Sequence, residues 1–371
     1  MSSTTDDPRT EFWVAQRRSP EWCCEPASPL VRDFHRSLAG YTPTPLVELP
    51  SVAAELGVGR VLVKDESDRL GLPAFKALGA SWAVRRVLDG QPPGRRLSLV
   101  AATDGNHGRA VARFARLLGQ QASIYVPGAV HSAAIQAIAD EGADVTVVDG
   151  SYDDTVATAA RACDAPDTVL IQDTAWDGYE TIPGWIVEGY ETLFAEIDDQ
   201  LKEYGLDRPN LVAVPTGVGS LLQAALTHYR SRIAAPGTAV VSVEPDTAAC
   251  VAASVAAGKP VTVQTAPTAM AGLNCGTPSL LAWPLIVNGL DAAIVVTEAA
   301  DIQAAHDLAA LGVPAGPCGA APLAALRAAL TGPGSAARRR HLRVGAESTV
   351  ILLSTEGNRS NPVPDPLPGR G

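Results

Sequence analysis

The sequence lacks any apolar stretch of about 18 residues free of charges and helix breakers, which is the length that a membrane-spanning helix needs. It also lacks a positively charged start followed by an apolar run. Residues 1–13 read MSSTTDDPRTEFW, begin with hydroxyls and acids, and do not resemble a secretion signal. Both absences argue against a membrane or exported protein. We therefore expect a soluble protein in the cytoplasm.

The sequence also lacks cysteine pairs spaced as in zinc sites. The six cysteines lack the paired spacing of zinc ligands, and in a chain of 371 residues they are more typical of buried thiols than of a disulfide framework. They are Cys23, Cys24, Cys163, Cys250, Cys275 and Cys318. We expect no metal site. Separate thiols at Cys250 and Cys275 are favoured over a disulfide, but the sequence leaves their pairing open.

An excess of positive charge is absent as well. Lys and Arg total 29, Asp and Glu total 40, and the net charge is therefore 29 − 40 = −11. Nucleic acids and anionic membranes attract clustered positive charge, so we expect neither as a partner. A small molecule is the favoured partner.

The chain does contain enough apolar residues, 46%, to bury sizeable cores. Single cores stop growing at about 250–300 residues, so this length predicts two lobes. Short β-branched runs alternate with Ala-rich helical stretches, which predicts an α/β fold with parallel strands joined by crossover helices. The expected strands are 61–64, 97–102, 123–126, 144–148, 211–215, 239–244 and 349–354.

Residues 61–83, VLVKDESDRLGLPAFKALGASWA, predict a strand, an acidic turn and a helix that begins near Lys76. The helix N-terminus and the apolar neighbours Phe75 and Leu78 should lower the pKa of this lysine. A lower pKa favours the neutral amine that forms a Schiff base. A lysine in such a place is more often exposed than catalytic, so the assignment depends on the segments that follow.

Residues 102–108, ATDGNHG, lie between a predicted strand and an amphipathic helix. Gly105 and Gly108 allow the backbone to approach a ligand, and Asn106 can hydrogen-bond a phenolic oxygen or a carboxylate. An ordinary turn between a strand and a helix is the alternative. By itself this loop is weak evidence.

Residues 212–221, VAVPTGVGSL, predict a strand, a loop of small residues and a helix. Backbone N–H groups of Gly217, Val218, Gly219 and Ser220 would face a concavity at a helix N-terminus, which suits a phosphate. The loop lacks the lysine of a P-loop and the third glycine of a dinucleotide fingerprint. A tight connection without a ligand is an equal alternative for this loop alone.

Residues 350–358, VILLSTEGN, predict an apolar strand that ends near Ser354. A hydroxyl at this position can hydrogen-bond a heterocyclic nitrogen without protonating it. Open α/β sheets bind ligands beyond the carboxyl ends of their strands. All four segments meet that requirement.

In this order the four segments resemble the pyridoxal 5′-phosphate (PLP) enzymes of fold type II, the tryptophan synthase β-like group. The resemblance extends from about residue 33 to residue 358. It implies two lobes, each with a mostly parallel sheet flanked by helices, and PLP in the cleft between them. Lys76 would hold the cofactor, and Asn106, residues 217–220 and Ser354 would contact it. The resemblance also implies a homodimer.

We expect residues 1–83 and 191–371 to form the large PLP-binding lobe and residues 84–190 to form a small mobile lobe. Residues 1–30 and 359–371 should be loosely ordered, because the tail has four prolines in its last eleven residues. Trp82 stands where the group more often has a tyrosine, and we expect it to narrow the pocket.

Within the group, the chain is most similar to the diaminopropionate ammonia-lyase family. The motifs that carry this similarity are AFKALGASWA, ATDGNHG, QDTAWDGYETIPGW, GVGS, MAGLNCG and LLSTEGN. Asp104 matches that family, whereas dehydratases and cysteine synthases have a small or hydroxyl residue there. Asp173 also matches. Two carboxylates would attract a β-ammonium group and could serve as general base and general acid. A turn or capping role for Asp173 is the alternative.

The resemblance therefore implies a PLP-dependent carbon–nitrogen lyase that converts 2,3-diaminopropionate to pyruvate and ammonia, with Lys76, Asp104 and Asp173 as catalytic residues. Elimination or replacement on another β-substituted amino acid, as in serine/threonine dehydratases or cysteine synthases, remains open. A non-catalytic binding protein of this fold is disfavoured, because Lys76 and the glycine loop are retained. The sequence does not decide the stereochemistry of the substrate or the pathway.

Overall fold

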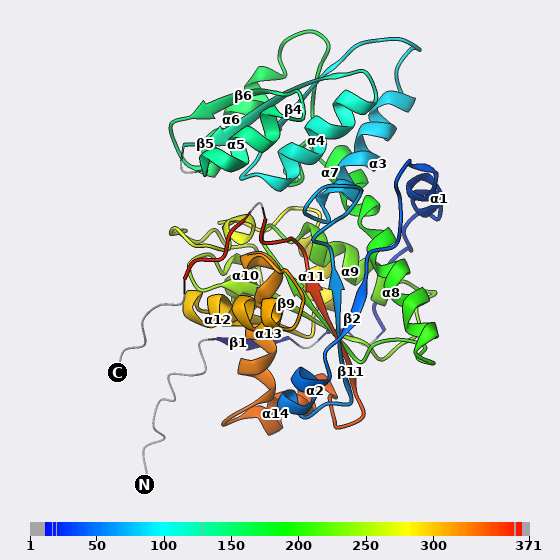
Figure 1. The fold of residues 1–371 in the computed structure, drawn as a ribbon, viewed down its shortest axis with the longest axis vertical. Helices are drawn as coiled ribbons and strands as arrows, with labels where there is room; N and C mark the ends of the chain where they lie inside the picture. Colours follow the sequence, from blue (N-terminus) through cyan, green and yellow to red (C-terminus); the bar gives the residue numbers. More distant parts are fainter. Residues whose placement is uncertain (1–11, 17, 20, 129, 360, 366–371) are drawn as a thin grey trace.

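The computed structural model describes residues 12–16, 18, 19, 21–128, 130–359 and 361–365. The chain folds into two lobes, each built on its own sheet with helices packed around it (Figure 1). The smaller lobe is drawn uppermost and the larger one below it. This arrangement agrees with the expected fold class.

A seven-stranded sheet forms the large lobe, in the order β1-β10-β9-β8-β11-β3-β2. Its inner pairs are parallel, and the edge strands β1 and β2 run antiparallel to β10 and β3. Both faces of the inner strands are covered, so their sequences are continuous apolar runs without alternation. The strands are β1 (Trp13–Ala15), β2 (Leu46–Glu48), β3 (Arg60–Asp65), β8 (Leu211–Pro215), β9 (Ala239–Pro245), β10 (Ala292–Val296) and β11 (Thr349–Ser354).

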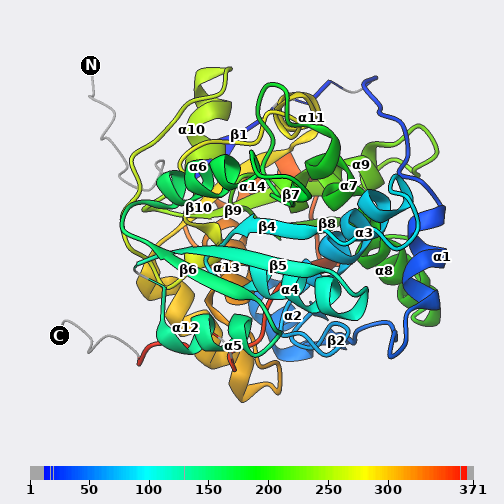
Figure 2. The same cartoon turned by 90° about the horizontal axis from the view of Figure 1, so that it is seen from above.

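The small lobe contains a four-stranded parallel sheet in the order β6-β5-β4-β7. Figure 2 shows it from above, with α5 and α6 beside its strands and α3, α4 and α7 alongside. Its strands are β4 (Ser98–Ala102), β5 (Gln121–Pro127), β6 (Asp144–Val148) and β7 (Thr168–Leu170). The helices of this lobe and its border are α3 (Lys76–Asp89), α4 (Asn106–Leu117), α5 (Ser132–Ala139), α6 (Tyr152–Ala162) and α7 (Thr181–Gly189).

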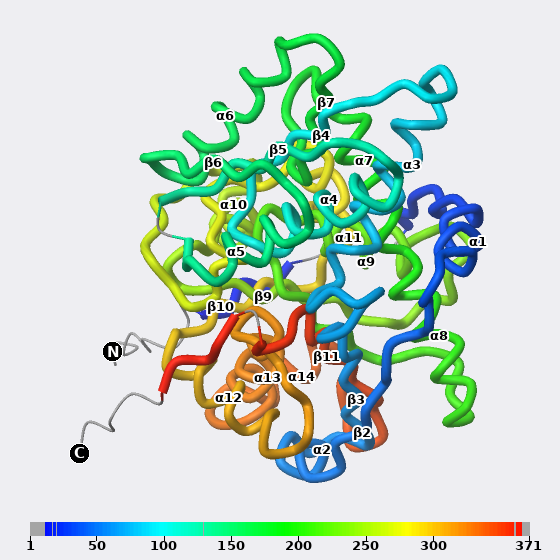
Figure 3. Tube along the Cα trace, turned by 45° about the horizontal axis from the view of Figure 1, so that its top comes forward, coloured from blue at the N-terminus to red at the C-terminus, as the bar shows by residue number. Residues whose placement is uncertain are grey.

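The remaining helices surround the large sheet, and Figure 3 follows the chain through them. They are α1 (Leu30–Ser37), α2 (Pro50–Leu56), α8 (Glu191–Glu203), α9 (Ser220–Arg230), α10 (Cys250–Ala257), η2 (Ala271–Leu273), α11 (Trp283–Gly289), α12 (Glu298–Ala310), α13 (Pro317–Leu330) and α14 (Ser335–Leu342). Among the described residues, no helix has the length and apolar character needed to cross a bilayer.

The expected strands are all present, with ends shifted by at most two residues. Four strands were not predicted: β1, β2, β7 and β10. Within the expected loosely ordered stretch 1–30, β1 pairs with β10 and α1 begins at Leu30. Residues 1–11 and 366–371 lie outside the described residues.

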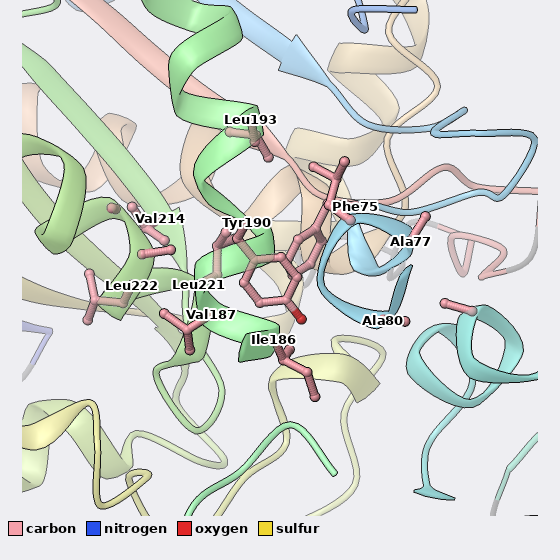
Figure 4. Packing of buried hydrophobic residues seen from close by; sticks show 14 of the residues in the cluster. Phe75, Ala77, Ala80, Ile186, Val187, Tyr190, Leu193, Val214, Leu221 and Leu222 are labelled. Atoms are coloured by element: carbon pink, nitrogen blue, oxygen red, sulfur yellow. The ribbon is translucent and has the colours of Figure 1, made fainter. Parts of the chain in front are cut away.

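Helices α3 and α7 cross at two glycines between the lobes. A Cβ atom on Gly189 would lie 2.7 Å from the Cα of Gly79, so neither position has room for a side chain. One residue beyond α7, the buried Tyr190 ring packs on Phe75 with 4.7 Å between centroids (Figure 4). Phe75 precedes the first residue of α3. This crossing therefore fixes the start of α3, where Lys76 lies.

Candidate active site

A cleft lies where the carboxyl ends of β4, β8 and β11 meet the start of α3. Its walls include residues from all four segments that the sequence singled out. Eight of the nine predicted site residues line it: Lys76, Asp104, Asn106, Asp173, Gly217, Val218, Gly219 and Ser220. The ninth, Ser354, is fully buried at the end of β11 and does not line the cleft.

Lys76 is the first residue of α3 and its ammonium contacts the carboxylate of Asp173. The Nζ atom lies 5.3 Å from the centre of the Phe75 ring. Burial acts to lower the pKa of Lys76, but the charge of Asp173 outweighs it and the pKa is raised. The expected lowering is therefore wrong in this structure, because a carboxylate brought from a distant segment dominates the helix N-terminus.

The other three lysines of the chain are not in the cleft. Lys64 is fully buried and its ammonium lies 2.6 Å from the carboxylate of Glu196. Lys202 and Lys259 are exposed. Lys76 is thus the cleft lysine of this chain.

The two acids lie in different electrostatic surroundings. Burial alone would raise the pKa of Asp173, but Lys76 and His107 lower it to about 2. Burial, together with the charge of Asp173, raises the pKa of Asp104 to about 7, and Lys76 opposes this only in part. Asp173 is therefore ionised at neutral pH, whereas Asp104 loses its proton only at a much higher pH than an ordinary carboxyl group. Such a difference in pKa lets one carboxyl group act as a base and the other as an acid.

The glycine loop follows β8 and leads into α9. Gly219 has φ +98°, a left-handed conformation that side chains rarely adopt. A Cβ atom on Gly217 would lie 2.9 Å from the Sγ atom of Cys275. The Oγ atom of Ser220 donates to the carbonyl of Asp173 at 2.6 Å, which joins the loop to the acid's segment. The first-turn N–H groups of α9 border the cleft, an arrangement that suits a phosphate.

Asn106 begins α4, and its Nδ2 atom donates to the Oε2 atom of Glu356 at 2.6 Å. Glu356 is buried, follows β11 by two residues and lines the cleft. The Oγ atom of Ser354 is buried and has no hydrogen-bond partner among the described residues. An unpaired buried hydroxyl costs free energy unless a further group satisfies it.

Several cleft residues were not singled out from the sequence. His107 follows Asn106, and its Nε2 atom lies 2.6 Å from the carbonyl oxygen of Ile171, which ties the loop to the segment of Asp173. Tyr152 begins α6 and accepts a hydrogen bond from Gln172 at 2.8 Å. Asn361 and Cys275 also line the cleft. Tyr152 and Asn361 carry no motif, so only the fold could place them.

Two further expectations concern Trp82 and the cysteines. Trp82 does not line the cleft: its Nε1 atom donates to Glu188 at 2.7 Å and its ring packs on Phe34. The expected narrowing is wrong because this side of α3 faces away from the cleft. All six cysteines are free thiols. The described residues contain no cluster of three or more His, Cys, Asp or Glu side chains that could hold a metal ion.

The chain belongs to the family of pyridoxal-phosphate dependent enzymes, whose family model matches residues 38–354. It is similar to the diaminopropionate ammonia-lyase of Escherichia coli K12, with 36% identity over 353 residues that cover 89% of this chain and 88% of that protein. The counterpart from Salmonella typhimurium is 35% identical and covers 88% of each chain. The crystal structure of the E. coli enzyme in complex with D-serine superposes with a TM-score of 0.84 and 32% identity over 93% of each chain.

The cleft fits PLP. The loop at the start of α9 suits its phosphate, and Lys76 can bond its aldehyde carbon. The hydroxyl of Ser354 has no hydrogen-bond partner among the described residues, but Ser354 does not line the cleft. A crystal structure of the E. coli enzyme with an aminoacrylate-PLP azomethine reaction intermediate has a TM-score of 0.83 with this chain. PLP is therefore the cofactor of this family member.

Proposed function

We propose that this protein is an ammonia-lyase that converts 2,3-diaminopropionate and water to pyruvate and two molecules of ammonia. The observation that carries the proposal is the pair of carboxylates, Asp104 and Asp173, beside the only cleft lysine of the chain. A substrate with a second amine explains the presence of two acids, because its β-ammonium group is attracted to their negative charge. A neutral serine side chain would not.

In this proposal Lys76 holds PLP, and the bound cofactor withdraws electrons from the substrate's α-carbon. Asn106, residues 217–220 and Ser354 bind and orient the cofactor. Asp104, Asp173 or the amine of Lys76 removes the α-proton, and the second acid protonates the departing β-amine. The contrast between a pKa of about 2 at Asp173 and about 7 at Asp104 supports a division of these tasks.

Three wider proposals accompany this one. Residues 84–190 act as the mobile lobe, with residues 1–83 and 191–371 as the PLP-binding lobe. Support comes from the four-stranded sheet, whose strands all lie between residues 98 and 170. The protein forms a homodimer, as the family resemblance implies, and acts in the cytoplasm.

The experiment compares Asp104→Asn and Asp173→Asn with the wild type on D- and L-2,3-diaminopropionate. Loss of one positioned proton-transfer group costs about 10² to 10⁴ in rate. One base cannot lie in line with the α-proton of both isomers. Each variant should therefore lose a different factor in rate on the D isomer than on the L isomer. The matched control is Asp144→Asn, an exposed acid at the start of β6 in the same lobe, which should keep wild-type rates. Equal, small losses in all three variants would refute the role of the two acids.

A further inference from the structure

The buried carboxylate of Glu356 joins three separate parts of the chain at the edge of the cleft. Its Oε2 atom accepts one hydrogen bond from Asn106 and one from Asn361, both at 2.6 Å. Its Oε1 atom accepts from the backbone N–H of Cys318 at 3.2 Å, at the start of α13. Glu356 is only 3% exposed, so water competes little for these bonds.

The position of this carboxylate is set by its backbone. Glu356 pairs with Ala74 in an isolated β-bridge, and its carbonyl accepts from the N–H of Gly316 at 2.9 Å. A Cβ atom on Gly316 would lie 3.1 Å from the Cγ atom of Glu356, so the side chain has little freedom. The carboxylate is therefore a fixed point to which the loop of Asn106 and the segment of Asn361 are attached.

Asn361 belongs to the last described stretch of the chain, residues 361–365. Its side chain lines the same cleft as Asp104 and Asn106. The stretch has a second attachment, in which the Nε2 atom of His306 on α12 donates to the carbonyl of Pro364 at 3.0 Å. Residues 361–365 are thus anchored at Asn361, which lines the cleft, and at Pro364.

We propose that Asn361 is a specificity-determining residue that forms part of the wall of the amino-acid site, and that Glu356 is a positioning residue that couples this wall to the loop carrying Asp104. The identity of the amino acid rests on the proposed function. The coupling through Glu356 does not, because it follows from the two hydrogen bonds on one carboxylate oxygen.

Asn361→Ala removes one of the two side-chain donors to the Oε2 atom of Glu356. It also replaces a side chain of the cleft wall with a shorter one. Hydrogen bonds to a charged group typically contribute enough to change an equilibrium about tenfold or more. We expect the KM for 2,3-diaminopropionate to rise about tenfold, with a smaller fall in kcat, because the same Glu356 oxygen also holds the loop of Asp104 through Asn106. Asn361→Asp places a second carboxylate against Glu356 and should raise KM further. The matched control is Asn358→Ala, because this neighbour makes no side-chain hydrogen bond to Glu356.

A second measurement does not depend on turnover. Hydrogen–deuterium exchange of the amides of residues 104–108 should quicken in Asn361→Ala and Asn361→Asp, although Asn361 is distant from them in sequence, and should match the wild type in Asn358→Ala. Unchanged exchange in both Asn361 variants would disprove the coupling through Glu356. An unchanged KM would disprove the proposal that Asn361 forms part of the amino-acid site. If the wild type does not act on 2,3-diaminopropionate, the proposed function fails, while the exchange result still decides the coupling.

Discussion

The crossing of α3 and α7 gives a prediction whose size follows from the structure. A Cβ atom on Gly189 would lie 2.7 Å from both the Cα of Gly79 and the carbonyl oxygen of Leu78. Ordinary van der Waals contact begins at 3.4 Å, so in Gly189→Ala this contact is 3.4 − 2.7 = 0.7 Å too short and the neighbouring backbone must shift. Overpacking of this kind costs about 1–3 kcal/mol of the free energy of unfolding.

A second glycine of α7 serves as the control. A Cβ atom on Gly184 would meet only the Cδ1 atom of Leu281, at 3.8 Å, which is ordinary contact. Gly184 lies inside α7 and Gly189 is its last residue, so the helix preference of alanine contributes at most about 1 kcal/mol at either position. The difference between Gly189→Ala and Gly184→Ala therefore isolates the packing cost.

The assay is urea unfolding of both variants at one fixed concentration of cofactor, because a ligand that binds the folded state raises apparent stability. Gly189→Ala should be less stable than Gly184→Ala by about 1–3 kcal/mol. It should also bind PLP more weakly, since α3 carries Lys76 at its first residue. Equal stability of the two variants would show that the crossing is not rigid, and the account of how Lys76 is positioned would be wrong.

Three further results are expected. Lys76→Ala should abolish turnover and the covalent, borohydride-reducible bond to PLP, whereas a variant that kept both would disprove the assignment. Gly219→Asp should weaken PLP binding sharply in a cofactor titration, because φ at this position is +98°, a Cβ atom there would lie only 3.1 Å from the Cβ atom of Ala282, and the added carboxylate would bring negative charge to the phosphate loop; unchanged affinity would exclude the loop. Burial raises the pKa of Asp301 to about 8, and its carboxylate has no hydrogen-bond partner among the described residues. Its folded pKa exceeds its unfolded value, so the stability it contributes is present at low pH and is lost as pH rises towards 8. Between pH 5 and 9, Asp301→Asn should therefore lose less stability than the wild type in thermal unfolding.

Most of the strands that could be predicted are buried parallel ones, although β10, which is also buried and parallel to β9, was missed. A run such as VILLS at 350–354 is apolar on both faces, and that pattern is local. Strand β7 has only three residues, and β1 and β2 are three-residue edge strands that depend on pairing with β10 and β3. Their sequences carry too little periodicity to predict a strand.

The site was predictable where glycines and a motif mark it, as at 104–108 and 217–220. The electrostatics were not. The pKa of Lys76 depends on Asp173, 97 residues away, and the pKa of Asp104 depends on burial that only the folded cleft provides. Likewise Trp82 has the expected place in the sequence, but the rotation of α3 turns its ring away from the cleft towards Phe34 and Glu188.

The most direct test of the proposed reaction is a comparison of kcat/KM for the purified wild type with PLP on 2,3-diaminopropionate, serine and threonine. The two carboxylates, Asp104 and Asp173, predict that 2,3-diaminopropionate is preferred over both hydroxyamino acids, with pyruvate and two equivalents of ammonia formed for each substrate molecule consumed. Efficient deamination of serine or threonine, with no action on 2,3-diaminopropionate, would contradict the two-carboxylate argument and leave only a PLP-dependent β-elimination.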